Sequence, residues 1–197
     1  MSIIRSIFGP SKDEIWAQIA AEYNGQFRNG GFLKKDSVHI MIDDWEILLD
    51  HFSRRQGKSS KSYTRIRAPF TNADNLYFKL YKKGFFSGIA KYFGMQDIHI
   101  KNEEFDREYI LKGNDEFKLT WIFDNTNIKK YLFEIDKIVL EIKENSGQFR
   151  SSTYEDGIDE LYFERKGIIK DINKLRSLFE LFAVVLAKIT ELDSGYQ

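Results

Sequence analysis

The stretch SVHIMIDDWEILLDHF, residues 37–52, changes side-chain character at nearly every second position. Side chains alternate between the two faces of a β-strand, so this period of two predicts two strands rather than a helix. Asp43 and Asp44 interrupt the pattern, and aspartates are typical of the turn between antiparallel strands. The residues expected on the apolar faces of these strands are Val38, Ile40, Ile42, Trp45, Ile47 and Leu49.

The same alternation continues on both sides of this stretch, from about residue 26 to residue 83. It is weaker in SYTRIRAPF (62–70) and clear again in NLYFKLYKK (75–83). Glycine, proline and polar residues break it at positions 30–31, 56–60 and 69–75, as expected for turns. This region therefore predicts an antiparallel meander.

Helical patterns lie at both ends of the chain and in its middle. Ser11 and Glu14 form a capping-box pattern that starts a helix over residues 12–24, and Gly25 stops it. A turn around Asn114 and Asp115 precedes one or two helices with a break at 125–127. Two more strands are expected at 137–143 and 159–167, while residues 85–94 fit either a short helix or a loop. The last helix, about 171–192, repeats apolar residues at helical spacing: Ile172, Leu175, Phe179, Phe182, Leu186 and Ile189.

These elements predict one domain over residues 1–197 with an α+β fold. We expect a mainly antiparallel meander sheet with an N-terminal helix, a middle helical insert and a long C-terminal helix packed on the sheet. The expected strand leading to the middle helices runs through Leu111. A chain of 197 residues with 42% apolar and 15% aromatic residues can bury a substantial core.

Composition excludes several classes of protein. The absence of cysteine excludes a disulfide framework and thiolate chemistry, and it is typical of a reducing compartment. The longest apolar run, at 178–187, is half the length of a membrane span. The N-terminal residues lack the pattern of a signal peptide. We therefore expect a cytoplasmic protein.

Charge is balanced overall but unevenly distributed. Residues 51–101 hold eleven Lys and Arg against two Asp and Glu, although the whole chain has a formal net charge of zero. The centre of this excess is RRQGKSSKSYTRIRAPF, residues 54–70. It makes the basic segment 54–91 a candidate contact for a polyanion or an acidic protein. The candidate binding residues are Arg54, Arg55, Lys58, Lys61, Tyr63, Arg65 and Arg67.

The basic segment has two other interpretations, in which its charges do not bind a partner. Its charges either remain solvated in a hairpin loop or pair with carboxylates of the acidic C-terminal third. A nucleotide-binding P-loop is excluded, because Phe52 stands where the first glycine before Gly57, Lys58 and Ser59 should be. The residues that follow are also strand-like, so no helix N-terminus is available for a phosphate.

Neither catalysis nor metal binding has a recognisable pattern. His39, His51 and His99 lie in separate strand-like segments without the spacing of metal ligands. No nucleophile motif is present, so the sequence predicts no catalytic residue, no metal and no cofactor. The alternative to surface binding is an apolar ligand held between a curved sheet and the C-terminal helix, with Trp45, Phe78 and Phe182 as its lining.

One segment resembles known sequences. FDREYILKGND, residues 105–115, is similar to the F-D-x-x-[FY]-x-[VIL]-x-G-[ND]-D segment of uncharacterised bacterial families of unknown function. The likeness extends weakly back through YTRIRAPF and LYFKLYKKG, and it implies no activity. From the residues themselves we expect Phe105 and Tyr109 to pack, and Gly113 to permit a tight reversal from strand to helix.

Overall fold

The computed structural model describes residues 9–31, 35–84, 95–144, 154–155 and 157–194. Its strands form one nine-stranded antiparallel sheet, and its helices pack against that sheet, which confirms the α+β class. The strands are β1 (Gln26–Arg28), β2 (Ser37–Ile42), β3 (Trp45–Gln56), β4 (Ser59–Thr71), β5 (Phe78–Lys82), β6 (Gln96–Ile98), β7 (Tyr109–Gly113), β8 (Val139–Lys143) and β9 (Ile158–Lys166). The helices are α2 (Lys12–Glu22), α3 (Glu103–Glu108), α4 (Glu116–Phe123), α5 (Thr126–Glu134) and α6 (Ile172–Ser194).

The order of strands in the sheet is β1-β2-β3-β4-β9-β8-β5-β7-β6. The first four strands follow one another as the predicted meander, but β5 does not pair with β4. Instead β9, the last strand in the sequence, lies between β4 and β8 and pairs with both. The sheet is therefore joined in its middle by a strand from the far end of the chain.

The predicted helix starts are confirmed in α2 and α4, whereas α5 begins at Thr126, inside the break that was predicted at 125–127. The Ser11 hydroxyl accepts a hydrogen bond from the Glu14 N–H, and the Glu14 side chain accepts one from the Ser11 N–H, which completes the capping box. Asp115 caps α4 and Asn125 caps α5 with their side-chain oxygens. These short polar side chains satisfy N–H groups that have no partner within the helix.

The predicted strand through Leu111 is wrong in its first half, because residues 103–108 form helix α3. The side chain of Asn102 accepts a hydrogen bond from the Phe105 N–H and starts this helix. Phe105 is buried in the core, and the strand begins at Tyr109. The apolar packing of Phe105 therefore outweighs the strand-like pattern around it.

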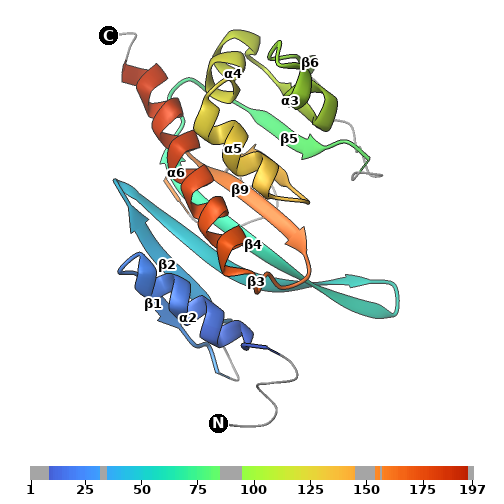
Figure 1. Ribbon diagram of the computed structural model, residues 1–197. Helices are drawn as coiled ribbons and strands as arrows, with labels where there is room; N and C mark the ends of the chain where they lie inside the picture. Colours follow the sequence, from blue (N-terminus) through green and yellow to red (C-terminus); the bar gives the residue numbers. More distant parts are fainter. Residues whose placement is uncertain (1–8, 32–34, 85–94, 145–153, 156, 195–197) are drawn as a thin grey trace.

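Helix α6 lies across one face of the sheet, with α2 on one side of it and α5 on the other (Figure 1). Its buried side chains and those of the facing strands form one core. The fully or almost fully buried residues of α6 are Leu175, Leu178, Phe179, Leu181, Phe182, Val185, Leu186 and Ile189. In the part of the chain that the structure describes, no helix is long and apolar enough to cross a membrane.

Gly113 is required by close packing. A Cβ atom at this position would lie 2.0 Å from Leu119 Cδ1 and 2.9 Å from the Tyr77 carbonyl oxygen. Its φ angle is not positive, so the constraint is space rather than a left-handed backbone. Phe105 and Tyr109 pack as expected, with ring centroids 5.1 Å apart.

Strands β3 and β4 extend beyond their neighbours as a two-stranded hairpin. The pairing of β2 with β3 ends at Asp50, and the pairing of β9 with β4 begins at Thr64. We call residues 51–63 the basic arm; in Figure 1 it projects from the sheet at the lower right. Gly57 and Lys58 form its turn, and glycine with a φ of +60° at the first central position is typical of a type II′ turn.

Candidate functional site

The basic segment divides into a part on the sheet and a part on the basic arm. On the sheet, Arg65 donates to Asp50 through Nε (2.8 Å to Oδ1) and Nη2 (2.6 Å to Oδ2). Arg67 donates to the same Asp50 Oδ2 at 3.1 Å and to Glu160 Oε1 at 3.4 Å. Asp50 is 8% exposed. The two arginines are therefore held in an internal ion-pair network.

Strand register explains this network. Asp50 on β3 lies directly opposite Arg65 on β4, and Glu160 on β9 lies opposite Pro69, next to Arg67 on the same face of the sheet. Opposite residues of an antiparallel pair have Cβ atoms about 5 Å apart. The carboxylate of Asp50 and the guanidinium of Arg65 therefore form their ion pair without any distortion of the backbone. The expectation that Arg65 and Arg67 share one face is confirmed, and this face points away from the helices.

Arg54 lies at the base of the basic arm and pairs with Glu164 at 3.1 Å. Its guanidinium also lies over the rings of Phe52 and Tyr63, at 5.4 and 4.9 Å from their centroids, and these rings stack on each other. Tyr162 donates to Glu164 at 2.8 Å. Burial alone would raise the pKa of Glu164, but the Tyr162 hydroxyl and the Arg54 charge hold it below its ordinary value.

Among the described residues, the remaining cations of the basic arm have no such partners. Arg55, Lys58 and Lys61, together with Lys166 from the end of β9, are exposed or partly exposed, and within the described residues none has a carboxylate within 4.0 Å. Arg55 donates weakly to the carbonyl of Gly57 at 3.4 Å. The neighbouring ammonium of Lys166 lowers the pKa of Lys61, because two like charges disfavour each other.

We call these four residues, Arg55, Lys58, Lys61 and Lys166, the unpaired cluster. Lys166 was not among the predicted residues, because the sequence does not show that β9 lies beside β4. Further along the segment 54–91, Lys79 pairs with Glu141 at 2.9 Å and Lys82 with Glu108 at 3.5 Å, while Lys83 donates to the Asp106 carbonyl at 2.6 Å. Lys91 lies outside the described residues.

The predicted cavity residues occupy the core. Phe78 and Phe182 are fully buried, and the Phe78 ring packs edge-on against Phe123 with centroids 5.0 Å apart. Trp45 is partly buried against the same core. A role of Trp45, Phe78 and Phe182 in ligand binding stays a prediction.

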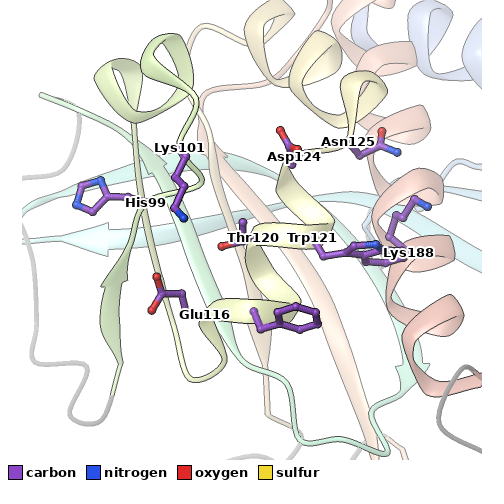
Figure 2. A pocket seen from close by; sticks show the side chains of 9 residues that line it. His99, Lys101, Glu116, Thr120, Trp121, Asp124, Asn125 and Lys188 are labelled. Atoms are coloured by element: carbon purple, nitrogen blue, oxygen red, sulfur yellow. The ribbon is translucent and has the colours of Figure 1, made fainter.

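A groove of about 760 Å³ is found instead along α4. Its lining includes Phe117 and Trp121, which are 71% and 39% exposed. Lys188 from α6 lies over the Trp121 ring at 4.4 Å (Figure 2). Lys101 and Glu116 reach the groove from the other side of α4, so its lining is both aromatic and charged.

The described His, Asp and Glu side chains were the candidates for a metal site. No group of three or more of these described side chains converges. His39 Nδ1 lies 2.8 Å from Glu46 Oε1 on the sheet surface, and His99 is exposed near the groove of α4.

Comparisons with known proteins give little to place beside this geometry. No protein-family model and no curated protein matches the chain. Among solved structures, the chain is similar to the crystal structure of the mycobacterial trehalose monomycolate transport factor A, TtfA, at a TM-score of 0.47 and 7% sequence identity, covering 88% of this chain and 95% of that chain. A likeness of this degree transfers no site residue to this chain.

Proposed function

We propose that this protein is a non-enzymatic binding domain that contacts an anionic macromolecule through its basic arm. The observation that supports this function is the unpaired cluster, four cations at one end of the sheet without a carboxylate among the described residues. Asp50 and Glu160 neutralise the arginines on the sheet, and Glu164 neutralises Arg54 at the base of the arm. The arm therefore concentrates positive charge that is available to a partner.

The position of Lys61 beside Lys166 supports the same function. Two neighbouring ammonium groups repel each other, so their proximity does not stabilise the fold. An anionic group bound between them removes this repulsion and gains attraction from both. Because the residues are solvated, this gain is screened by salt, and binding weakens as ionic strength rises.

The number of cations determines how steeply binding should depend on the salt concentration. Four Lys and Arg contacts on a nucleic acid give a slope of log K against log salt of about −3.6, at roughly −0.9 per neutralised phosphate. An acidic protein surface gives a smaller salt dependence, acting mainly on the association rate. In either case we expect weak, salt-sensitive binding rather than a tight permanent complex.

The experiment that tests this function is heparin chromatography of the wild type and two triple variants. One replaces Arg55, Lys58 and Lys61 with Gln, which removes three charges from the unpaired cluster. The control replaces three exposed cations elsewhere with Gln: Arg28, Lys130 and Lys170. We expect the arm variant to elute at clearly lower salt than the control. Equal elution of the two variants contradicts the proposal, because it shows that net charge alone decides retention.

A second candidate function is binding of a small amphipathic molecule in the groove of α4. The exposed rings of Phe117 and Trp121 favour it, and a volume of about 760 Å³ falls in the usual range of ligand sites. Native mass spectrometry of the freshly purified protein tests this function. A bound mass that disappears in Trp121→Ala supports it, whereas a bare mass for the wild type speaks against it.

A further inference from the structure

The outer edge of β3 in the basic arm presents backbone groups that no described residue binds. The hairpin closes at the pair Gln56↔Ser59, and in a two-residue hairpin this closing pair is hydrogen-bonded. Hydrogen-bonded and non-hydrogen-bonded pairs alternate along an antiparallel ladder. The N–H and C=O groups of His51, Ser53 and Arg55 therefore point away from β4, beyond the residue at which β2 ends.

The opposite edge of the basic arm confirms this alternation and is already occupied at its base. Gly167 donates to the Ser62 carbonyl at 2.8 Å and accepts from the Thr64 N–H at 3.0 Å. These β4 residues are the ones whose backbone groups point away from β3. Gly167 thus closes the β4 edge near the sheet, whereas within the described residues nothing equivalent closes the β3 edge.

The charge of the basic arm determines which strand can occupy this edge. An open strand edge is a template for pairing with another chain. Pairing of two copies along β3 would bring the cations of both arms together, and like charges opposite each other destabilise a sheet. A strand with Asp or Glu side chains would instead place carboxylates beside Arg54 and Arg55. Charge therefore disfavours pairing of β3 with a second copy of the arm and favours pairing with an acidic segment.

We infer that the outer edge of β3, residues 51–55, binds an acidic segment of a partner protein in extended conformation, which adds to the arm as a further strand. The inference rests on the proposed function and narrows it. Backbone hydrogen bonds to His51, Ser53 and Arg55 would give affinity, and the flanking cations would give selectivity. A nucleic acid has no regular row of N–H and C=O groups with which to make this ladder.

Two acidic peptides of identical side-chain sequence separate strand addition from simple charge attraction. One is an eight-residue peptide of alternating Glu and Thr, and the other has the same side chains with every backbone nitrogen methylated. Both are titrated into the full-length protein by fluorescence anisotropy, with a single-stranded DNA of similar charge as a third ligand. We expect the methylated peptide to bind at least about tenfold more weakly, because it lacks the backbone donors.

The outcomes distinguish this inference from the proposed function. Equal affinity of the two peptides overturns strand addition and leaves charge-based binding intact. Binding of the DNA with no binding of either peptide also overturns strand addition and leaves charge-based binding intact. If neither peptide nor DNA binds and heparin retention does not depend on the arm, both the inference and the proposed function fail.

A substitution on the protein gives an independent test. Ser53→Pro removes an outward N–H that the β3–β4 ladder does not use, and proline is tolerated at such edge positions. Ser53→Ala is the matched control, because it changes the side chain and keeps the N–H group. We expect Ser53→Pro to weaken the unmethylated peptide about tenfold relative to Ser53→Ala, with unchanged retention on heparin. Equal peptide affinity of the two variants overturns the inference.

Discussion

Strand β4 carries Arg65 on the sheet and Lys61 on the basic arm, and the two differ in what surrounds them. Arg65 has strands on both sides, one of which supplies Asp50, while β9 supplies Glu160 to its neighbour Arg67. Lys61 has β3 on one side, with Arg54 directly opposite it, and the neighbouring ammonium of Lys166 lowers its pKa. A cationic side chain is thus held in an ion pair within the fold at one end of β4, and a cationic side chain at the other end is available to a partner.

The difference follows from where the acidic residues lie. The arm itself, residues 51–63, contains no Asp or Glu, so cross-strand pairing within the hairpin cannot neutralise its cations. On the sheet, each neighbouring strand provides further positions from which a carboxylate can face an arginine. A hairpin that leaves the sheet moves away from these partners: Arg54 at its base still reaches Glu164, whereas the charges of Arg55, Lys58 and Lys61 persist in the folded protein.

Asp50→Ala is expected to have the largest effect, because it removes one carboxylate from two arginines. Removing one partner of a buried ion pair costs about 3–5 kcal/mol, and the side chains here are partly solvated, so we expect about 3 kcal/mol of destabilisation. Urea unfolding measures it. The matched variant on the arm, Arg55→Ala, should change stability by no more than about 0.5 kcal/mol. Similar values for both variants would remove the distinction between sheet and arm.

Gly57→Ala should act on the arm alone. No atom lies within 4 Å of a Cβ at this position, so the cost comes from the φ of +60° and amounts to about 1 kcal/mol. Hydrogen exchange should become faster in residues 51–63 and remain unchanged in the core strands. Lys58→Ala, at the neighbouring turn position, serves as the control and should leave exchange unaltered. Faster exchange throughout the sheet would show that the arm is not an independent unit.

Glu164→Gln should reveal the pH dependence of the boundary between sheet and arm. The pKa of Glu164 lies below its ordinary value of 4.5, so its charged form stabilises the fold above that pH. This contribution is lost as the pH falls through the depressed pKa. We expect Glu164→Gln to be less stable than the wild type by about 1 kcal/mol at neutral pH, with a smaller gap at pH ~3. A gap of the same size at both pH values would contradict this assignment.

Lys166→Gln should produce the smallest effect, confined to one ionisation. Without the neighbouring ammonium, the pKa of Lys61 should rise toward its ordinary value. Titration of the Lys61 side chain by heteronuclear NMR measures the change. Lys170→Gln, which removes an exposed cation outside the unpaired cluster, should leave that titration unaltered. An unchanged Lys61 in both variants would show that the two ammonium groups do not interact.

Local patterns in the sequence were sufficient to predict much of the fold. Ser11 and Asp115 start helices as expected, because capping depends on residues within one turn. The alternation in residues 37–70 correctly predicted β2, β3 and β4. The place of β9 beside β4 could not be predicted in this way, since pairing of distant strands is decided by tertiary packing.

The network around Asp50 was missed, although the sequence contains a signal for it. If Gly57 and Lys58 form a two-residue turn, counting outward from Gln56 and Ser59 places Asp50 opposite Arg65. This count requires the turn to be known, and Gly-Lys is not a strong hairpin pattern. Lys166 gave no signal at all, because its neighbour Lys61 lies far away in the sequence.

The position of β9 has a consequence for how the chain folds. During synthesis β4 and β8 both emerge before β9, so each of them has an unpaired edge until residues 158–166 are available. Contacts between residues so distant in sequence form slowly. The two halves of the sheet must therefore wait for a segment near the C-terminus, and a chain shortened before Ile158 would retain two exposed strand edges prone to aggregation.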